Sequence, residues 1–384
     1  MFQYFSENYW WSLMTMSALQ TGGEISEIDE ICRPLEALSR RGIEDHGANE
    51  EWFVAWTRMG HRLARLAQAD AEAGYPIGAA RKHYRAALYF SVGELALDAR
   101  VVARGREAYL RGLENFRRGV ELSGDPVELV EIPYEDTTLD ALFVRAPEGD
   151  GPAPCVIHFG GADSLKEHLY LRYRDDWRRQ GISLLIVDHP GVGTAIRLKG
   201  LPTRADIEVA ASASADYLAT RSDVDAERLG ICALSQGGYY APRIAALEKR
   251  MKLCVVWGAI WDMETIVNEY NSITRGKLKP KQHRTFGGLE PDEVVERLRQ
   301  MTLEGLADKI ECPLLVLHGE NDQQAPLWRA QKTYDEAVNA SRRDYKVFTV
   351  EDGGAEHCQV DIMTMATDYI IDWAAQRFRE MGQA

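Results

Sequence analysis

The sequence predicts an α/β protein in which a mostly parallel β-sheet, covered by helices on both faces, follows a separate helical region. Short apolar runs alternate with helical stretches over the last two thirds of the chain, which is typical of a parallel sheet. Residues 1–125 have helical periodicity instead, and the sequence SGDP at 123–126 separates the two patterns. The length of 384 residues fits about two domains of roughly 150 residues or more.

The first 125 residues are expected to form a helical domain. Trp52, Trp56, Met59, Leu63 and Leu66 follow one another at intervals of four, three, four and three residues, which places them on one face of a helix. Two further helices are expected, one over residues 79–97 and one carrying Tyr109, Leu113, Phe116 and Val120. No 34-residue self-similarity is present, so a plain helical domain is favoured over tetratricopeptide repeats.

Residues 126–384 are expected to form the sheet domain. Continuous apolar runs are typical of parallel strands that are buried on both faces. The first two predicted strands form an antiparallel pair and six more follow; the eight are 127–135, 139–145, 155–160, 183–188, 229–234, 253–258, 314–319 and 345–350. The helices expected between and after them are 170–179, 204–220, 237–249, 326–338 and 358–379.

An insertion is expected at about residues 260–310, between the sixth and seventh strands. It contains a polar, turn-rich segment at 269–288 and a helical run at 291–301. Connections this long are usually functional lids or insertions. We therefore predict a lid at this position.

The strongest chemical signal is Ser235, which stands between an apolar strand and a helix. A nucleophile elbow needs this order, because the sharp turn lifts the serine hydroxyl above the sheet. Small residues flank the turn where strand and helix come close, here Ala233, Gly237 and Gly238. The usual motif has glycine at the position of Ala233. The alternative interpretation of Ser235 is an ordinary helix N-cap.

A serine nucleophile needs a base and an acid, which in this kind of fold follow it in the order acid, then histidine. Asp322 follows the strand at 314–319 and a tight turn, and Glu320 is the alternative acid. His357 follows the last strand and a double glycine, and is expected at the start of the last helix. His318 is expected to be structural.

An oxyanion formed during attack needs preorganised N–H donors. The amide of Gln236 is one candidate, and the amide of Gly161 or Ala162 in the loop after the third strand is the other. Asp163 and Glu167 in the same loop are candidates for substrate contact. The alternative, which we favour, is that Ser164 and Glu167 form a helix capping box.

Two aromatic residues are further candidates for substrate contact. Trp257 ends the sixth strand, and Tyr239 follows the elbow. Ordinary core packing is the alternative for such residues. The glycine-containing turn at 188–195 lacks the Lys-Ser/Thr of a phosphate loop, so it is expected to be a tight turn lining the site.

Composition excludes several classes of partner. A net charge of −14 disfavours nucleic acid. The six cysteines are scattered without zinc-site spacing, so we expect no metal and a reducing, cytoplasmic environment. No run of about 18 apolar residues is present and the N-terminal segment makes a poor signal peptide, so no membrane association is expected.

Together, the helical N-terminal region and four motifs resemble the 2,6-dihydroxypseudooxynicotine hydrolase family of α/β-hydrolases. The motifs are GGADSLKE (160–167), SQGGYYAPR (235–243), HGEND (318–322) and GGAEHC (353–358). Fungal heptaketide-shortening hydrolases and the fermentation–respiration switch protein are relatives. The resemblance covers most of the chain and is clearest from about residue 80 onward. It implies the α/β-hydrolase fold, and it maps the family's serine, aspartate and histidine to Ser235, Asp322 and His357.

The resemblance also implies a cofactor-independent hydrolase of a small ketone or ester, with a site between the helical domain and the core and often a homodimeric assembly. Cleavage of a C–C bond in a β-diketone-like, aryl or polyketide ketone is the first expectation. A carboxylesterase or lactone hydrolase is the alternative, because the same three residues serve both reactions. A non-catalytic regulator on the same scaffold is a further alternative, and a peptidase is disfavoured because the N-terminal region is helical.

Overall fold

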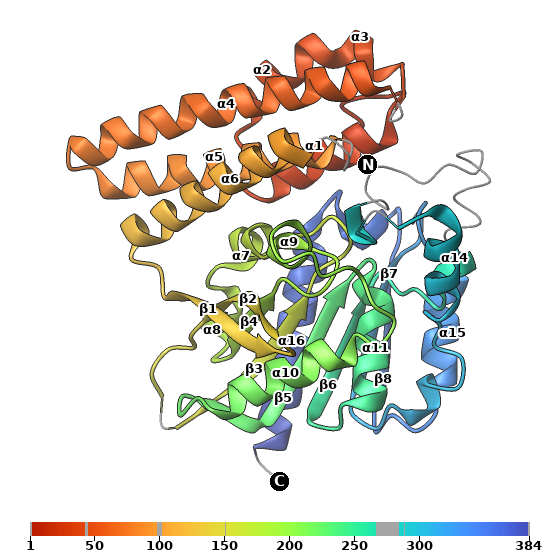
Figure 1. Ribbon diagram of the computed structural model, residues 1–384. Helices are drawn as coiled ribbons and strands as arrows, with labels where there is room; N and C mark the ends of the chain where they lie inside the picture. The colour runs from red at the N-terminus through yellow and green to blue at the C-terminus, as the bar shows by residue number, and fades with distance from the viewer. Residues whose placement is uncertain are drawn as a thin grey trace. The chain divides into compact units, whose positions relative to one another are not determined.

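The computed structural model describes residues 2–42, 45–97, 102–149, 151–265, 284–287 and 289–382 (Figure 1). The chain divides into two compact units. One comprises Met1–Val127 with Lys279–Arg284, and the other comprises Glu128–Leu278 with Thr285–Ala384. Among the described residues, no helix has the length and apolar character needed to cross a membrane.

The first unit is helical and has an aromatic core. Trp11, Trp52 and Trp56 are fully buried, with ring centroids 4.8 and 5.1 Å apart along the series. Leu66 is 44% exposed although it shares the helical spacing of Trp52 and Trp56, and Ala67 beside it is buried instead. The elements are α1 (Tyr9–Gln20), α2 (Ile25–Cys32), η1 (Arg33–Leu35), α3 (Glu36–Ser39), α4 (His46–Glu72), α5 (Pro76–Leu95) and α6 (Val102–Ser123).

The second unit is built on one eight-stranded sheet in the order β1-β2-β4-β3-β5-β6-β7-β8. Strand β2 runs antiparallel to β4, and the strands from β4 through β3 to β8 are parallel to their neighbours. The strands are β1 (Val127–Tyr134), β2 (Thr137–Val144), β3 (Ala153–Phe159), β4 (Ser183–Val187), β5 (Val224–Leu234), β6 (Met251–Trp257), β7 (Leu314–Gly319) and β8 (Arg343–Phe348). This is the predicted α/β-hydrolase architecture.

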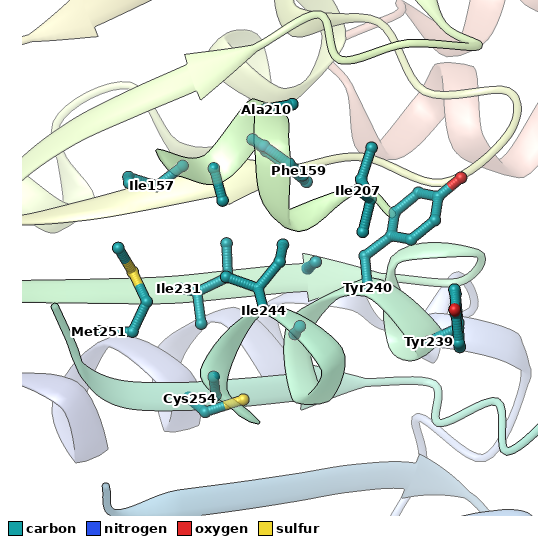
Figure 2. Packing of buried hydrophobic residues seen from close by; sticks show 14 of the residues in the cluster. Ile157, Phe159, Ile207, Ala210, Ile231, Tyr239, Tyr240, Ile244, Met251 and Cys254 are labelled. Carbon is teal, nitrogen blue, oxygen red and sulfur yellow. The ribbon is translucent and has the colours of Figure 1, made fainter. Parts of the chain in front are cut away.

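Helices cover both faces of this sheet. Figure 1 shows α10 (Glu208–Ala219) and α11 (Gly237–Leu247) in front of it and α16 (Met363–Met381) behind it. Figure 2 shows the core beside α11, where Ile244 lies close to Ile231 of β5 and Tyr240 lies close to Ile207. The remaining elements are α7 (Lys166–Tyr173), α8 (Asp176–Arg179), α9 (Gly193–Arg197), α14 (Pro291–Arg299), η2 (Ala307–Lys309), α15 (Trp328–Glu336) and η3 (His357–Gln359).

Two expected helices differ from the structure where the backbone turns left-handed. The one expected at 170–179 is split into α7 and α8 at Arg174, whose φ is 34°. The last helix does not begin at 358, because Cys358 and Gln359 have left-handed φ values of 49° and 51°. His357 therefore lies in the short turn η3, and α16 begins only at Met363.

The expected lid at about 260–310 lies partly outside the described residues, which omit 266–283 and 288. Its predicted helix is α14. A β-bridge joins Asp262 to Thr302, and the N–H of Met263 donates to the carbonyl of Met301 at 2.9 Å. The two ends of the insertion are therefore tied together beside the sheet.

Candidate active site

Ser235 lies on a strained turn between β5 and α11. Its φ of 59° is in the left-handed region, which non-glycine residues rarely adopt. A Cβ on Gly238 would lie 2.1 Å from the carbonyl oxygen of Gly258, so the helix can approach β6 this closely only with glycine there. Leu234 and Gln236 are buried while Ser235 itself is partly exposed. The turn therefore presents the serine at the carboxyl end of the sheet, as a nucleophile elbow requires.

The structure brings Ser235, His357 and Asp322 into one hydrogen-bonded chain. Nε2 of His357 lies 2.9 Å from Oγ of Ser235, and Nδ1 lies 2.7 Å from Oδ2 of Asp322. The other oxygen of Asp322 accepts the N–H groups of Gln324 and Ala325 at 2.8 and 2.9 Å. These bonds fix the carboxylate so that it holds the imidazole edge toward the serine.

Of the two candidate acids, Asp322 is the one that contacts His357. Glu320 is exposed, and its carboxylate accepts the N–H of Val350 at 2.9 Å instead. His318 lies behind Asp322, with Nε2 at 2.7 Å from the carbonyl of Ala325. Because a carbonyl can only accept, this nitrogen carries a proton. That bond and its complete burial agree with the structural role expected of His318.

Asp322 and His357 each shift the pKa of the other in the direction that favours its charged form. Burial acts to lower the pKa of His357, but the Asp322 carboxylate outweighs it and holds this pKa well above the ordinary histidine value. Burial acts to raise the pKa of Asp322, but His357 outweighs it and holds that pKa below the usual range. The arrangement therefore favours an ionised Asp322 and stabilises an imidazolium at His357.

The loop after β3 lies against the nucleophile. A Cβ on Gly161 would fall 2.6 Å from Cβ of Ser235 and 3.0 Å from its Oγ. The N–H of Gly161 already donates to Oγ of Ser164 at 2.9 Å. Within the described residues, the N–H groups of Ala162 and Gln236 have no intramolecular acceptor. Of the predicted donors, Gln236 and Ala162 thus remain open for an oxyanion.

A buried ionic cluster of Lys166, Glu167 and Asp188 joins the loop after β3 to the end of β4. Nζ of Lys166 lies 2.7 Å from Oδ2 of Asp188 and 2.6 Å from Oε1 of Glu167. Asp188 also accepts the N–H of Lys166 at 3.1 Å and that of Thr194 at 2.9 Å. The turn at 188–195, expected to line the site, thus anchors the loop that carries Gly161. Sequence reasoning missed Asp188, whose one signal was an acid directly after an apolar strand.

The predicted capping box is wrong. Helix α7 begins at Lys166, its N-cap is Leu165, and no side chain caps it. Ser164 accepts from Gly161, and Glu167 pairs with Lys166 instead. The reason is that the buried ammonium of Lys166 attracts the Glu167 carboxylate, which is thereby held away from the helix terminus.

The four residues predicted to contact substrate occupy different environments. Asp163 is partly exposed in the loop beside Gly161, whereas Glu167 is buried in the cluster. Tyr239 and Trp257 are fully buried. The hydroxyl of Tyr239 donates to the carbonyl of Ala205 at 3.2 Å. Neither aromatic side chain therefore offers an exposed atom to a ligand in this structure, and their packing matches the core alternative.

All six cysteines are free thiols. Within the described parts of the chain, no three His, Cys, Asp or Glu residues gather as a group that could hold a metal ion. Sequence reasoning also missed the bond between the indole N–H of Trp257 and Gln359, two residues after His357. The described site is thus composed of a serine, an imidazole, a carboxylate and backbone amides.

The eight-stranded sheet and the elbow at Ser235 define the protein as an enzyme of the α/β-hydrolase class. Comparison with family models places it further: the model described as "Esterase FrsA-like" matches residues 46–277, and the chain belongs to this family. A model of the prolyl oligopeptidase family also matches residues 210–380.

Individual relatives are similar over most of their length. The alpha/beta hydrolase gkaG of Penicillium citrinum is 28% identical over 320 residues, which are 71% of this chain and 74% of that protein. The 20-hydroxy-prefusarin hydrolase FUS2 of Gibberella moniliformis is 29% identical, with 73% and 76% covered. The 2,6-dihydropseudooxynicotine hydrolase of Paenarthrobacter nicotinovorans is 26% identical, with 73% and 74% covered.

Solved structures share the fold. The crystal structure of 2,6-dihydroxy-pseudo-oxynicotine hydrolase superposes with a TM-score of 0.76 at 21% identity, covering 94% of this chain and 95% of that one. AbyA5 superposes with a TM-score of 0.67 at 17% identity, covering 96% and 98%. The predicted relationship to the oxynicotine hydrolase and to fungal hydrolases is confirmed.

Proposed function

We propose that this protein is a cofactor-independent serine hydrolase that uses Ser235, His357 and Asp322. The observation that carries the proposal is the hydrogen-bonded chain from Ser235 Oγ through His357 to Asp322, with separations of 2.9 and 2.7 Å. A serine hydroxyl becomes a useful nucleophile only when such a base takes its proton. The left-handed turn at Ser235 and the two open amides support the same role.

The reaction would begin with attack of Ser235 Oγ on a substrate carbonyl while His357 accepts the hydroxyl proton. The amides of Gln236 and Ala162 would stabilise the oxyanion. Collapse of the tetrahedral intermediate breaks the bond to the leaving group, which takes the proton from His357. Water then attacks the acyl-enzyme and gives a proton to His357. Collapse of this second tetrahedral intermediate breaks the bond to Ser235 Oγ, which takes the proton back from His357 as the acid product leaves.

We propose a small ketone as the substrate, cleaved at the C–C bond next to its carbonyl. The leaving carbon then departs as a carbanion, which a second carbonyl stabilises as an enolate or an aryl group stabilises by delocalisation, and this carbon takes its proton from His357. Support comes from the family resemblance and from relatives named as hydrolases of 2,6-dihydropseudooxynicotine and 20-hydroxy-prefusarin. A carboxylesterase or lactone hydrolase is the second candidate, favoured by the match to an esterase family.

We also propose roles for the helical region and the insertion, a compartment and an assembly. The helical region 1–125 and the insertion at about 260–310 would cap the catalytic domain 126–384, and Asp163, the partly exposed residue among the predicted substrate contacts, would reach the substrate. Six free cysteines favour a reducing compartment such as the cytoplasm. A homodimer is proposed from the resemblance alone.

The test is covalent labelling with a fluorophosphonate, followed by peptide mapping. We expect one adduct on Ser235 in the wild type and none in Ser235→Ala. Ser212→Ala is the matched control, since its hydroxyl donates to Glu248 at 2.6 Å and takes no part in the chain, and it should label fully. No adduct on folded wild-type protein would refute an activated serine and favour the non-catalytic regulator. Turnover of a β-diketone against a nitrophenyl ester then separates the two reactions.

A further inference from the structure

Trp257, the last residue of β6, is hydrogen-bonded to the turn that carries the nucleophile. Its backbone carbonyl accepts the N–H of Ser235 at 2.8 Å. Strands β5 and β6 are parallel neighbours, and Leu234 pairs with Trp257 at the end of the ladder. The position of Ser235 is therefore set in part by Trp257.

The side chain of the same residue binds the segment that carries the base. The indole N–H of Trp257 donates to Oε1 of Gln359 at 2.6 Å, and both residues are fully buried. Water cannot replace this bond, so loss of either partner leaves the other without a hydrogen bond. Gln359 stands two residues after His357, which makes the bond a direct restraint on the turn η3.

This turn is strained and needs such a restraint. Cys358 and Gln359 have φ values of 49° and 51°, and consecutive left-handed non-glycine residues persist only where the surroundings hold them. Sγ of Cys358 lies 3.7 Å from the Trp257 carbonyl oxygen and 3.6 Å from Nε2 of His357. A Cβ on Gly258 would lie 2.7 Å from the same sulfur. Residues 257–258 thus form the surface against which the turn is folded.

Core packing alone does not account for these contacts. Trp177 is equally buried in the same unit, yet its indole N–H has no partner among the described residues. Trp257 differs because one residue contacts both the nucleophile turn and the histidine turn. Its distance from solvent also explains why it is better placed to orient these groups than to touch a substrate.

We propose that Trp257 and Gln359 are positioning residues, which hold His357 in line with Ser235 by fixing the left-handed turn to the end of β6. This inference rests on the proposed function of Ser235 and His357. No sequence pattern predicts this pair, because 102 residues separate its members along the chain.

The test compares Trp257→Phe and Gln359→Met with the wild type. Phenylalanine keeps an aromatic ring, though a smaller one, and the backbone carbonyl, but removes the indole N–H. Methionine removes the acceptor Oε1. It breaks no second hydrogen bond, because Nε2 of Gln359 has no partner among the described residues. The readout is the rate constant of fluorophosphonate labelling of Ser235, measured at several pH values. Circular dichroism gives the fraction of folded protein, by which each rate is divided. We expect a plateau rate at least about tenfold lower in each variant, because small misplacements of reacting groups are costly.

The double variant should label no more slowly than the slower single variant, since both remove one interaction. Trp373→Phe is the matched control: it removes an indole bond of 2.7 Å to Asp344, far along α16, and should keep the wild-type rate. Wild-type rates in both Trp257→Phe and Gln359→Met would overturn the inference, as would strictly additive losses. If wild-type Ser235 itself is not labelled, the proposed function fails instead. Should Trp257→Phe not fold, Gln359→Met carries the same decision.

Discussion

The backbone of Gly161 lies directly against the side chain of Ser235, with room for a hydrogen but not for a methyl group. An added Cβ would fall 2.6 Å from Cβ of Ser235 and 3.1 Å from the carbonyl oxygen of Leu234. The φ of Gly161 is not positive, so glycine is needed here for lack of space and not for its backbone conformation. The loop after β3 and the nucleophile turn are therefore fitted to one another.

Gly161→Ala should reduce kcat by about 100-fold, because the methyl group must displace either the serine or the loop that carries Ala162. Overpacking should also lower the free energy of unfolding by about 1–3 kcal/mol. Steady-state kinetics and urea unfolding measure the two effects. Gly105→Ala is the control, since its nearest contact would be an ordinary 3.6 Å and alanine favours the helix. Unchanged kcat in Gly161→Ala would show that the loop does not adjoin the working nucleophile.

Asp322→Asn should reduce kcat/KM by about 10³- to 10⁴-fold, since an amide neither orients the imidazole correctly nor stabilises its charged form. His357 must be neutral to accept a proton, so the rate falls as pH drops through its pKa. The Asp322 carboxylate raises that pKa. Without it, the acid limb of the pH–rate profile should move to lower pH. The profile of kcat/KM measures both changes.

Glu320→Gln is the matched control for this experiment. Glu320 is an exposed acid two residues earlier that contacts the Val350 amide and not His357. We expect activity within about threefold of the wild type and an unmoved acid limb. The opposite result, with Glu320→Gln impaired and Asp322→Asn active, would reassign the acid.

Much of this site could be predicted from sequence because each of its three residues follows an apolar strand. Parallel strands end at the same edge of a sheet, so Ser235 after β5, Asp322 after β7 and His357 after β8 meet there. The inner strands β3, β4, β6 and β7 are predictable to within a few residues, since burial on both faces makes them continuous apolar runs.

The supporting contacts could not be predicted, because they depend on which strands become neighbours. Lys166 and Asp188 meet because β3 and β4 are adjacent and parallel. The spacing of apolar residues also does not reveal backbone strain. It therefore predicts that the last helix begins at 358, where two left-handed residues in fact prevent a helix.

Lys166→Met should lower the free energy of unfolding by about 3–5 kcal/mol, since it leaves the buried Asp188 and Glu167 carboxylates without their cation. The cation holds the pKa of Asp188 below its usual range against the effect of burial. In the variant both carboxyl groups should have raised pKa values in the folded state, so the folded protein binds protons more readily than the unfolded one. The deficit should then shrink as pH falls toward 5. Urea unfolding at several pH values measures it.

Lys249→Met provides the comparison for that cluster. Lys249 also pairs with a carboxylate, Glu311 at 2.9 Å, but its side chain is 52% exposed. An exposed pair contributes at most about 1 kcal/mol. If Lys166→Met costs no more than Lys249→Met, the buried cluster does not hold the loop.

Tyr239→Phe distinguishes the two roles expected of Tyr239, substrate contact and core packing. Its hydroxyl donates to the carbonyl of Ala205 and lies 3.3 Å from a guanidinium nitrogen of Arg243, which donates to it. Because the residue is fully buried, we expect KM to stay within about twofold while the free energy of unfolding falls by about 1 kcal/mol. Kinetics on any accepted ester or ketone and urea unfolding test this. A large rise in KM with unchanged stability would instead place Tyr239 in the substrate pocket, which would require the loop around Ala205 to open when substrate binds.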